Sequence, residues 1–176
     1  MLFRSPYTEV INQVQATINQ PEYWKQTTIV LDATGGNVFL DHLRAARLGA
    51  QIIPVLITAG HQSSESGGKH HVPKQDLIAN LEALFRERRI WLPAPALTPA
   101  RQRGDTSPAS DHLKQLIQEL HAFERLPGPQ GKATFSGKAT SQDDLVIALA
   151  LAAWRAVKTR PDLNHNKGIW GTQRLL

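Results

Sequence analysis

The sequence contains no cysteine, and this absence excludes disulfide bonds and thiolate metal sites. It also has no apolar run close to the roughly 18 residues that a membrane-spanning helix requires. The first ten residues, MLFRSPYTEV, lack the apolar centre of a signal peptide. Nothing therefore argues for secretion or for membrane insertion, and we expect a cytoplasmic protein.

The composition is otherwise ordinary for a globular protein. The chain has 176 residues, of which 41% are hydrophobic and 20% charged, and this length suits a single domain over 1–176. The formal net charge of +5 is compatible with nucleic-acid binding and equally with a basic solvated surface. Only 86–89 (RERR) and 100–103 (ARQR) concentrate basic residues.

The N-terminal half has the pattern of a βαβ unit. Apolar residues recur at helical spacing in 7–19 and again in 38–48. Two continuous, β-branched runs at 27–31 and 51–57 are typical of strands buried on both faces. Pro54 favours a position near a sheet edge or a bulge, because proline cannot donate a backbone hydrogen bond. We therefore expect a parallel pair of strands joined by a helix.

The remainder alternates amphipathic segments with polar or proline-rich ones. We expect helices at 74–88, 111–124 and 141–157, short extended pieces at 90–92 and 132–137, loops at 60–72 and 93–110, and an irregular tail at 159–176. These predictions, with the βαβ unit, indicate an α/β fold.

Asp32 follows the first predicted strand directly. The carboxyl ends of strands in open α/β sheets are where ligands bind, so this residue is a candidate site acid. It is equally suited to start an Asx-turn before Thr-Gly-Gly. The segment DATGGN falls short of G-x-G-x-x-G, so a nucleotide-binding βαβ protein is a weaker hypothesis.

Asp143 and Asp144 open the last predicted helix within SQDD, at 141–144. Such residues commonly cap a helix and suit its dipole. The helix behind them is apolar nearly all round, which predicts that it is buried and that its first turn faces the sheet. If Asp32 lies there too, the carboxylates could share a divalent ion, and oxygen ligands favour Mg²⁺ or Mn²⁺. Two such ions could activate water against a phosphodiester.

The stretch GGKHH, at 67–71, suggests other sites at first sight. His70 and His71 are adjacent and have no partner at zinc-ligand spacing. The residues around Lys69 do not follow the P-loop pattern. We interpret all three as loop residues, with a possible position near DNA.

Five segments of the sequence, in order, resemble the C-terminal nuclease domain of bacteriophage large terminase subunits over about residues 6–157. They are YTEVINQVQATI, IVLDATGGNVFLDHLRAARLGAQIIPVLITAG, HVPKQDLIANLEALF, LKQLIQELHAF and FSGKATSQDDLVIALALAAW. The most specific pieces are the Asp-Ala-Thr-Gly after a strand, the Val-Pro-Lys before a helix, and the Asp-Asp before an alanine- and leucine-rich helix.

The resemblance implies an RNase H-like mixed sheet flanked by helices, and a nuclease that cuts double-stranded DNA during genome packaging with Mg²⁺ or Mn²⁺. Asp32 matches the acid on the central strand. The Asp143–Asp144 pair matches the acid at the start of the last helix, with Asp143 favoured as the closer ligand. Phosphate contacts are expected from Lys69, Lys74, Arg101 and Arg103. Other terminase or portal components in a bacterial host are expected partners.

The sequence also departs from the family pattern. In the family, a first catalytic acid lies on a β-meander before the first helix, whereas only MLFRSP precedes that helix here, and no Walker A motif is present. Glu9 is not an obvious substitute, and Gln142 stands where a histidine often precedes the acid pair. We therefore expect a truncated meander and an unpaired sheet edge, which favours self-association. The alternative to an active nuclease is a catalytically incomplete remnant that binds DNA or self-associates.

Overall fold

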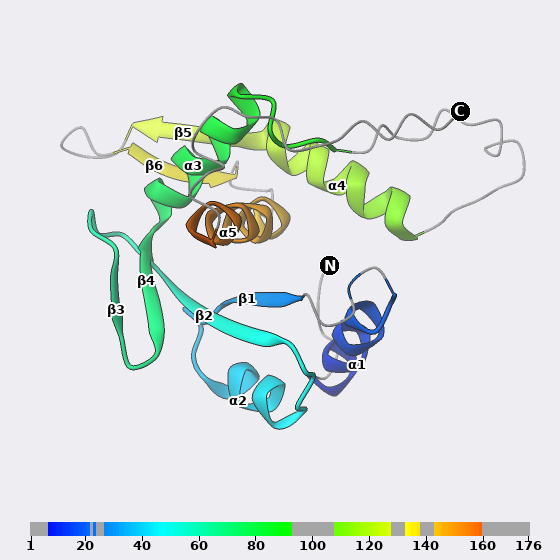
Figure 1. Cartoon of the computed structure of the whole chain (residues 1–176). Helices are drawn as coiled ribbons and strands as arrows, with labels where there is room; N and C mark the ends of the chain where they lie inside the picture. Colours follow the sequence, from blue (N-terminus) through cyan, green and yellow to red (C-terminus); the bar gives the residue numbers. More distant parts are fainter. Residues whose placement is uncertain are drawn as a thin grey trace, which may run out of the picture.

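The computed structural model describes residues 7–21, 23, 27–92, 108–127, 133–137 and 143–159. In these residues the chain forms five helices, a four-stranded mixed sheet and a separate two-stranded sheet (Figure 1). The predicted α/β class is confirmed at this level.

The predicted βαβ unit is confirmed. Strand β1 (Thr28–Asp32) pairs in parallel with β2 (Gln51–Thr58), with Asp32 opposite Val55, and helix α2 (Val38–Ala45) connects them. The β-branched residues of both runs suit these strands. This pairing places Asp32 at the carboxyl end of the parallel strands.

A β-hairpin occupies the segment that we predicted to be a loop at 60–72, so that prediction is wrong. Strand β4 (Lys69–Pro73) pairs in parallel with β2 and antiparallel with β3 (Ser64–Ser66), giving the order β1-β2-β4-β3. Gly67 and Gly68 connect β3 to β4 at φ angles of 57° and 70°. A two-residue turn with positive φ at both positions matches the twist of a hairpin and is favoured by glycine.

Pro54 lies inside the sheet, on β2. The pairing of β2 with β4 begins at Val55, whereas β1 lies opposite Pro54 itself. At this point β2 therefore has a neighbouring strand on one side only. This is the sheet position that the missing proline N–H allows.

Helices lie on both sides of the four-stranded sheet (Figure 1). Helix α5 (Asp144–Thr159) packs against β1 and against α3 (Lys74–Arg86), whereas α2 lies on the opposite side and contacts α1 (Tyr7–Ile18). Because α5 has neighbours on several sides, its apolar sequence is explained.

The second sheet lies beyond α5. Helix α4 (Pro108–Ala122) contacts α5 and leads into β5 (Phe123–Pro127), which pairs antiparallel with β6 (Ala133–Gly137). The predicted extended piece is confirmed as β6, and the predicted helix 111–124 begins earlier and ends before Phe123. Residues 93–107 and 160–176, with most of the predicted loop and tail, lie outside the described residues.

The segment 90–92 is irregular, so the predicted short strand is wrong. Ile90 packs against the core, whereas Trp91 is 81% exposed. Arg88 precedes this segment at a φ of 54°. The chain therefore leaves α3 through a left-handed residue and does not continue into a sheet.

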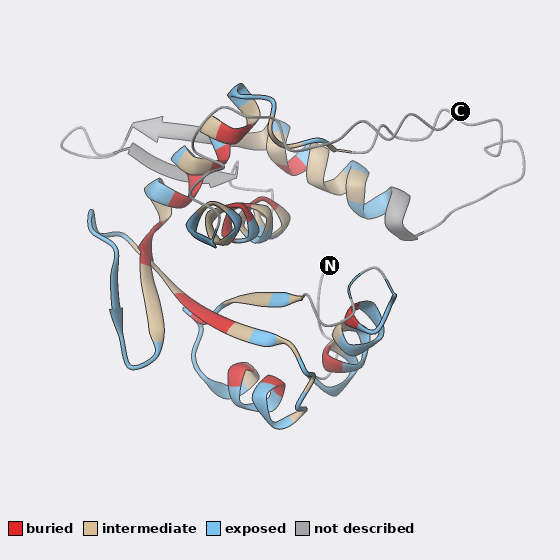
Figure 2. Cartoon of the chain, in the orientation of Figure 1, coloured by how far each residue is buried: buried red, intermediate tan, exposed pale blue. Residues whose placement is uncertain are grey.

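The main core lies between β2, β4, α3 and α5 (Figure 2). Its buried members are Ile53, Val55, Val72, Leu77, Ile78, Leu81, Leu84, Val146, Ala150, Leu151 and Ala153. Burial of each large aliphatic side chain stabilises the fold by about 1.5–3 kcal/mol before entropy is counted. This core fixes the start of α5 relative to the carboxyl end of β1. Among the helices that the structure describes, none is long and apolar enough to cross a membrane.

Candidate functional site

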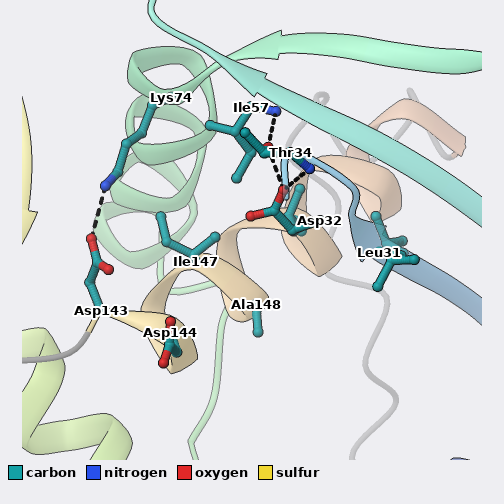
Figure 3. Close-up of a pocket in the computed structure, with 11 residues that line it drawn as sticks. Leu31, Asp32, Thr34, Ile57, Lys74, Asp143, Asp144, Ile147 and Ala148 are labelled. Carbon is teal, nitrogen blue, oxygen red and sulfur yellow. Dashed lines mark hydrogen bonds and ion pairs between the residues drawn. The ribbon is translucent and has the colours of Figure 1, made fainter. Parts of the chain in front are cut away.

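A pocket of about 490 Å³ lies between the carboxyl end of β1 and the start of α5 (Figure 3). Its polar lining consists of Asp32, Thr34, Lys74, Asp143 and Asp144. Its apolar lining consists of Val30, Leu31, Ile57, Ile147, Ala148 and Leu151. The two groups of acids predicted from the sequence therefore line the same pocket.

Asp32 forms the predicted Asx-turn and also lines the pocket. Its Oδ1 atom accepts hydrogen bonds from the Thr34 backbone N–H, at 2.9 Å, and from the Thr34 hydroxyl. Thr34 Oγ1 in turn accepts the Ile57 N–H at 2.9 Å, which ties this turn to β2. Asp32 thus forms an Asx-turn and also presents its carboxylate to the pocket.

Asp143 lies immediately before α5, and its carbonyl accepts the Ile147 N–H at 2.9 Å. Its carboxylate points toward Lys74, the first residue of α3, with 2.8 Å between Asp143 Oδ2 and Lys74 Nζ (Figure 3). The two side chains are 29% and 31% exposed. Lys74 Nζ also lies 5.9 Å from the centroid of the Phe123 ring. Asp144 is exposed at the first position of α5.

Glu119, on α4, caps α5. This side chain is only 5% exposed, and its Oε2 atom accepts the Leu145 N–H at 2.8 Å and the Val146 N–H at 3.4 Å. Its Oε1 atom accepts a hydrogen bond from Gln115 Nε2 at 3.1 Å. A carboxylate on free N–H groups suits the positive end of the helix dipole.

This cap changes the interpretation of the acid pair. The sequence suggested a capping box between Ser141 and Asp144, and Ser141 lies outside the described residues. The N–H groups at Leu145 and Val146 bond to Glu119. Asp143 and Asp144 line the pocket. We did not predict Glu119, because in the sequence it is a polar position of an amphipathic helix. Its role depends on how α4 crosses α5.

The predicted basic residues divide into three groups. Lys74 lines the pocket. Lys69, at the start of β4, instead donates a hydrogen bond to Asn37 Oδ1, next to α2. Arg101 and Arg103 lie outside the described residues.

Lys69, His70 and His71 lie on β4, so our interpretation of them as loop residues is wrong. His70 Nδ1 is 3.4 Å from Glu65 Oε2, and its ring packs edge-on against Trp154 at 5.4 Å between centroids. His71 Nε2 lies 2.9 Å from Ser66 Oγ. Both rings therefore have partners within the hairpin and α5.

The polar lining suits a hard divalent cation by its chemistry, because its acidic donors are all carboxylate oxygens. The spacing of these side chains, however, does not form a full metal site. Across the described ranges, no three acidic or histidine side chains approach closely enough to hold one metal ion. Asp32 and the Asp143–Asp144 pair are the residues that could supply the ligands.

Comparison with known proteins assigns no family to the chain. No family model, no curated protein and no solved structure matches it.

Proposed function

We propose that this chain is a terminase-type nuclease domain that cleaves double-stranded DNA with Mg²⁺ or Mn²⁺ during phage genome packaging in the bacterial cytoplasm. The observation that carries the proposal is the convergence of Asp32 with Asp143 and Asp144 on one pocket. These residues are distant in the sequence and come from β1 and from the start of α5. Structural capping does not account for the pair, because Glu119 caps that helix.

An RNase H-like fold is part of this proposal. The mixed sheet, with a parallel β1–β2 pair and helices on both sides, is compatible with it. In the proposed family the acid-bearing strand is central, whereas β1 pairs with β2 alone in the described sheet. The other edge of β1 is where we would place the strands of the meander.

In this mechanism Asp32 and Asp143 or Asp144 would hold the metal. Once bound, the ion would polarise the scissile phosphate and activate a water molecule. Thr34 orients the Asp32 carboxylate through two hydrogen bonds. Lys74 brings a positive charge to the pocket, where a phosphate would enter.

The test is nicking of supercoiled plasmid in Mn²⁺ by the wild-type chain and by Asp32→Asn. The matched control is Asp41→Asn, which changes an exposed aspartate on α2. We expect metal-dependent nicking by the wild type and by Asp41→Asn, and none by Asp32→Asn. Equal, negligible nicking by the wild type and Asp32→Asn would remove the enzymatic assignment.

The second candidate function is a catalytically incomplete module that binds DNA or self-associates. It is favoured by two features of the described residues: no three acids or histidines form a metal cluster, and one side of β1 pairs with no described strand. The β1 sequence TIVLD has no lysine or proline, the residues that usually protect a sheet edge. The opposite edge strand, β3, is short, polar and exposed. Light scattering should therefore show a mass that rises with concentration, and a monomer at every concentration would contradict self-association.

A further inference from the structure

Lys74 is the one basic residue among the described residues that line the pocket (Figure 3). Its ammonium group forms an ion pair with Asp143, at 2.8 Å. The pair joins the first residue of α3 to the residue before α5. It therefore bridges two helix starts across the pocket.

The position of Lys74 is unfavourable for its own helix. A lysine in the first turn faces the positive end of the helix dipole, whereas acidic residues are stabilising there. Asp143, by contrast, places a negative charge at the start of α5, where the helix dipole favours it. The local stability of α3 therefore does not explain why a lysine occupies this position. The ion pair between Lys74 and Asp143 does explain it.

The contact also decides which carboxylate oxygens remain open to another cation. Asp143 Oδ2 is bound to Lys74, and Asp32 Oδ1 is bound to Thr34. A metal ion that used both oxygens of Asp143 would have to displace the ammonium group. The positive charge of Lys74 would also repel a cation that entered beside it.

We propose that Lys74 is an internal counter-cation that competes with the divalent metal for Asp143. This inference rests on the proposed function, since it assumes that the pocket takes up Mg²⁺ or Mn²⁺. The ion pair balances the charge of Asp143 and orders its side chain while the pocket holds no metal. Metal uptake releases Lys74, which then faces a phosphate group entering the same pocket.

The test is calorimetric titration of Mn²⁺ into the whole chain as wild type and as Lys74→Gln. We expect Lys74→Gln to lower the dissociation constant about fivefold, which corresponds to the upper range for a partly exposed ion pair. Lys74→Arg keeps the charge and should bind Mn²⁺ no more tightly than the wild type. Lys114→Gln, an exposed lysine outside the pocket, should match the wild type.

Equal or weaker Mn²⁺ binding by Lys74→Gln overturns the proposal, and so does an absence of binding by both proteins. The gain in Mn²⁺ affinity must also disappear in the double variant Lys74→Gln/Asp143→Asn. Thermal unfolding in EDTA shows whether each variant is folded. Lys74→Met, which retains an aliphatic chain near Phe123, replaces Lys74→Gln if that variant is unfolded.

Plasmid nicking on the same preparations separates this proposal from the nuclease assignment. Tighter Mn²⁺ binding by Lys74→Gln without nicking by the wild type would support the competition and remove the nuclease. Nicking that requires Asp32, with unchanged Mn²⁺ affinity in Lys74→Gln, would keep the nuclease and remove the competition.

Discussion

A lysine lies beside an aromatic ring at each end of α5, Lys74 of α3 at the start and Lys158 of α5 itself at the end, but the two charges have different explanations. At the C-terminal end, Lys158 Nζ lies 5.1 Å from the centroid of the Trp154 ring and 3.4 Å from His70 Nδ1. His70 in turn lies 3.4 Å from Glu65. A cation in the last turn suits the helix dipole, and the hairpin supplies the remaining partners. Local structure therefore accounts for this end.

The N-terminal end is different, because its acids exceed what the helix requires. Glu119 already satisfies N–H groups of the first turn, so Asp143 and Asp144 are not needed as caps. Asp143 forms an ion pair with Lys74, the first residue of α3. The dipole of α3 disfavours a positive charge at this position. Local structure therefore does not explain the lysine at this position, and its charge is the one to test for function.

The largest effect is expected from Asp143→Asn in the nicking assay. In the proposed mechanism Asp143 would hold the metal, so its loss would remove several kcal/mol of transition-state stabilisation, and we expect nicking to fall by at least about a hundredfold. The measurement is the initial rate of nicking at saturating Mn²⁺. Activity close to that of the wild type would assign the metal to Asp144, and the parallel Asp144→Asn variant shows which acid is required.

Glu119→Ala is expected to have the largest effect on stability. It removes a buried carboxylate that bonds to two backbone N–H groups of α5, at a cost of about 2–3 kcal/mol. Urea unfolding followed by circular dichroism measures this loss. Glu65→Ala, which removes an exposed partner at the other end, is the control and should cost less than about 1 kcal/mol. Similar losses for the two variants would show that Glu119 is not a cap.

Part of the contrast between the two ends of α5 could be predicted from the sequence. The continuous apolar runs and the nearly all-apolar last helix predicted β1, β2 and a buried α5, and strand polarity placed Asp32 at the carboxyl edge. Together these features predicted that Asp32 would lie on the same side of the sheet as Asp143 and Asp144, and the three acids line one pocket. The pattern of local residues was sufficient because each acid directly adjoins a strongly apolar element.

The remaining features depend on tertiary contacts or on a turn signal that we did not use. The role of Glu119 requires the crossing of α4 and α5, and the Lys74–Asp143 pair requires two helix starts to converge. Gly67-Gly68 is a known signal for a two-residue hairpin turn, but the polar residues around it led us to predict a loop. Strand β4 is nevertheless stabilised there, since Val72 is buried in the core.

A smaller effect is expected from Gly68→Ala in this hairpin. An added Cβ meets no atom within 4 Å, so the cost comes from the left-handed backbone alone and should be about 1 kcal/mol. Urea unfolding measures it, and the change should leave Mn²⁺ binding at the pocket unaltered. A matching loss of Mn²⁺ affinity would show that the two ends of α5 are coupled.

The smallest effect is expected from Lys158→Gln. This lysine is exposed, and its favourable interactions are with the helix dipole, the Trp154 ring and His70. Such surface contacts contribute less than about 1 kcal/mol and weaken as salt increases. We therefore expect a small loss of stability at low salt, a smaller one at high salt, and unchanged plasmid nicking. Reduced nicking with normal stability would place Lys158 on the DNA-binding surface, and the contrast between a structural and a functional end of α5 would then be wrong.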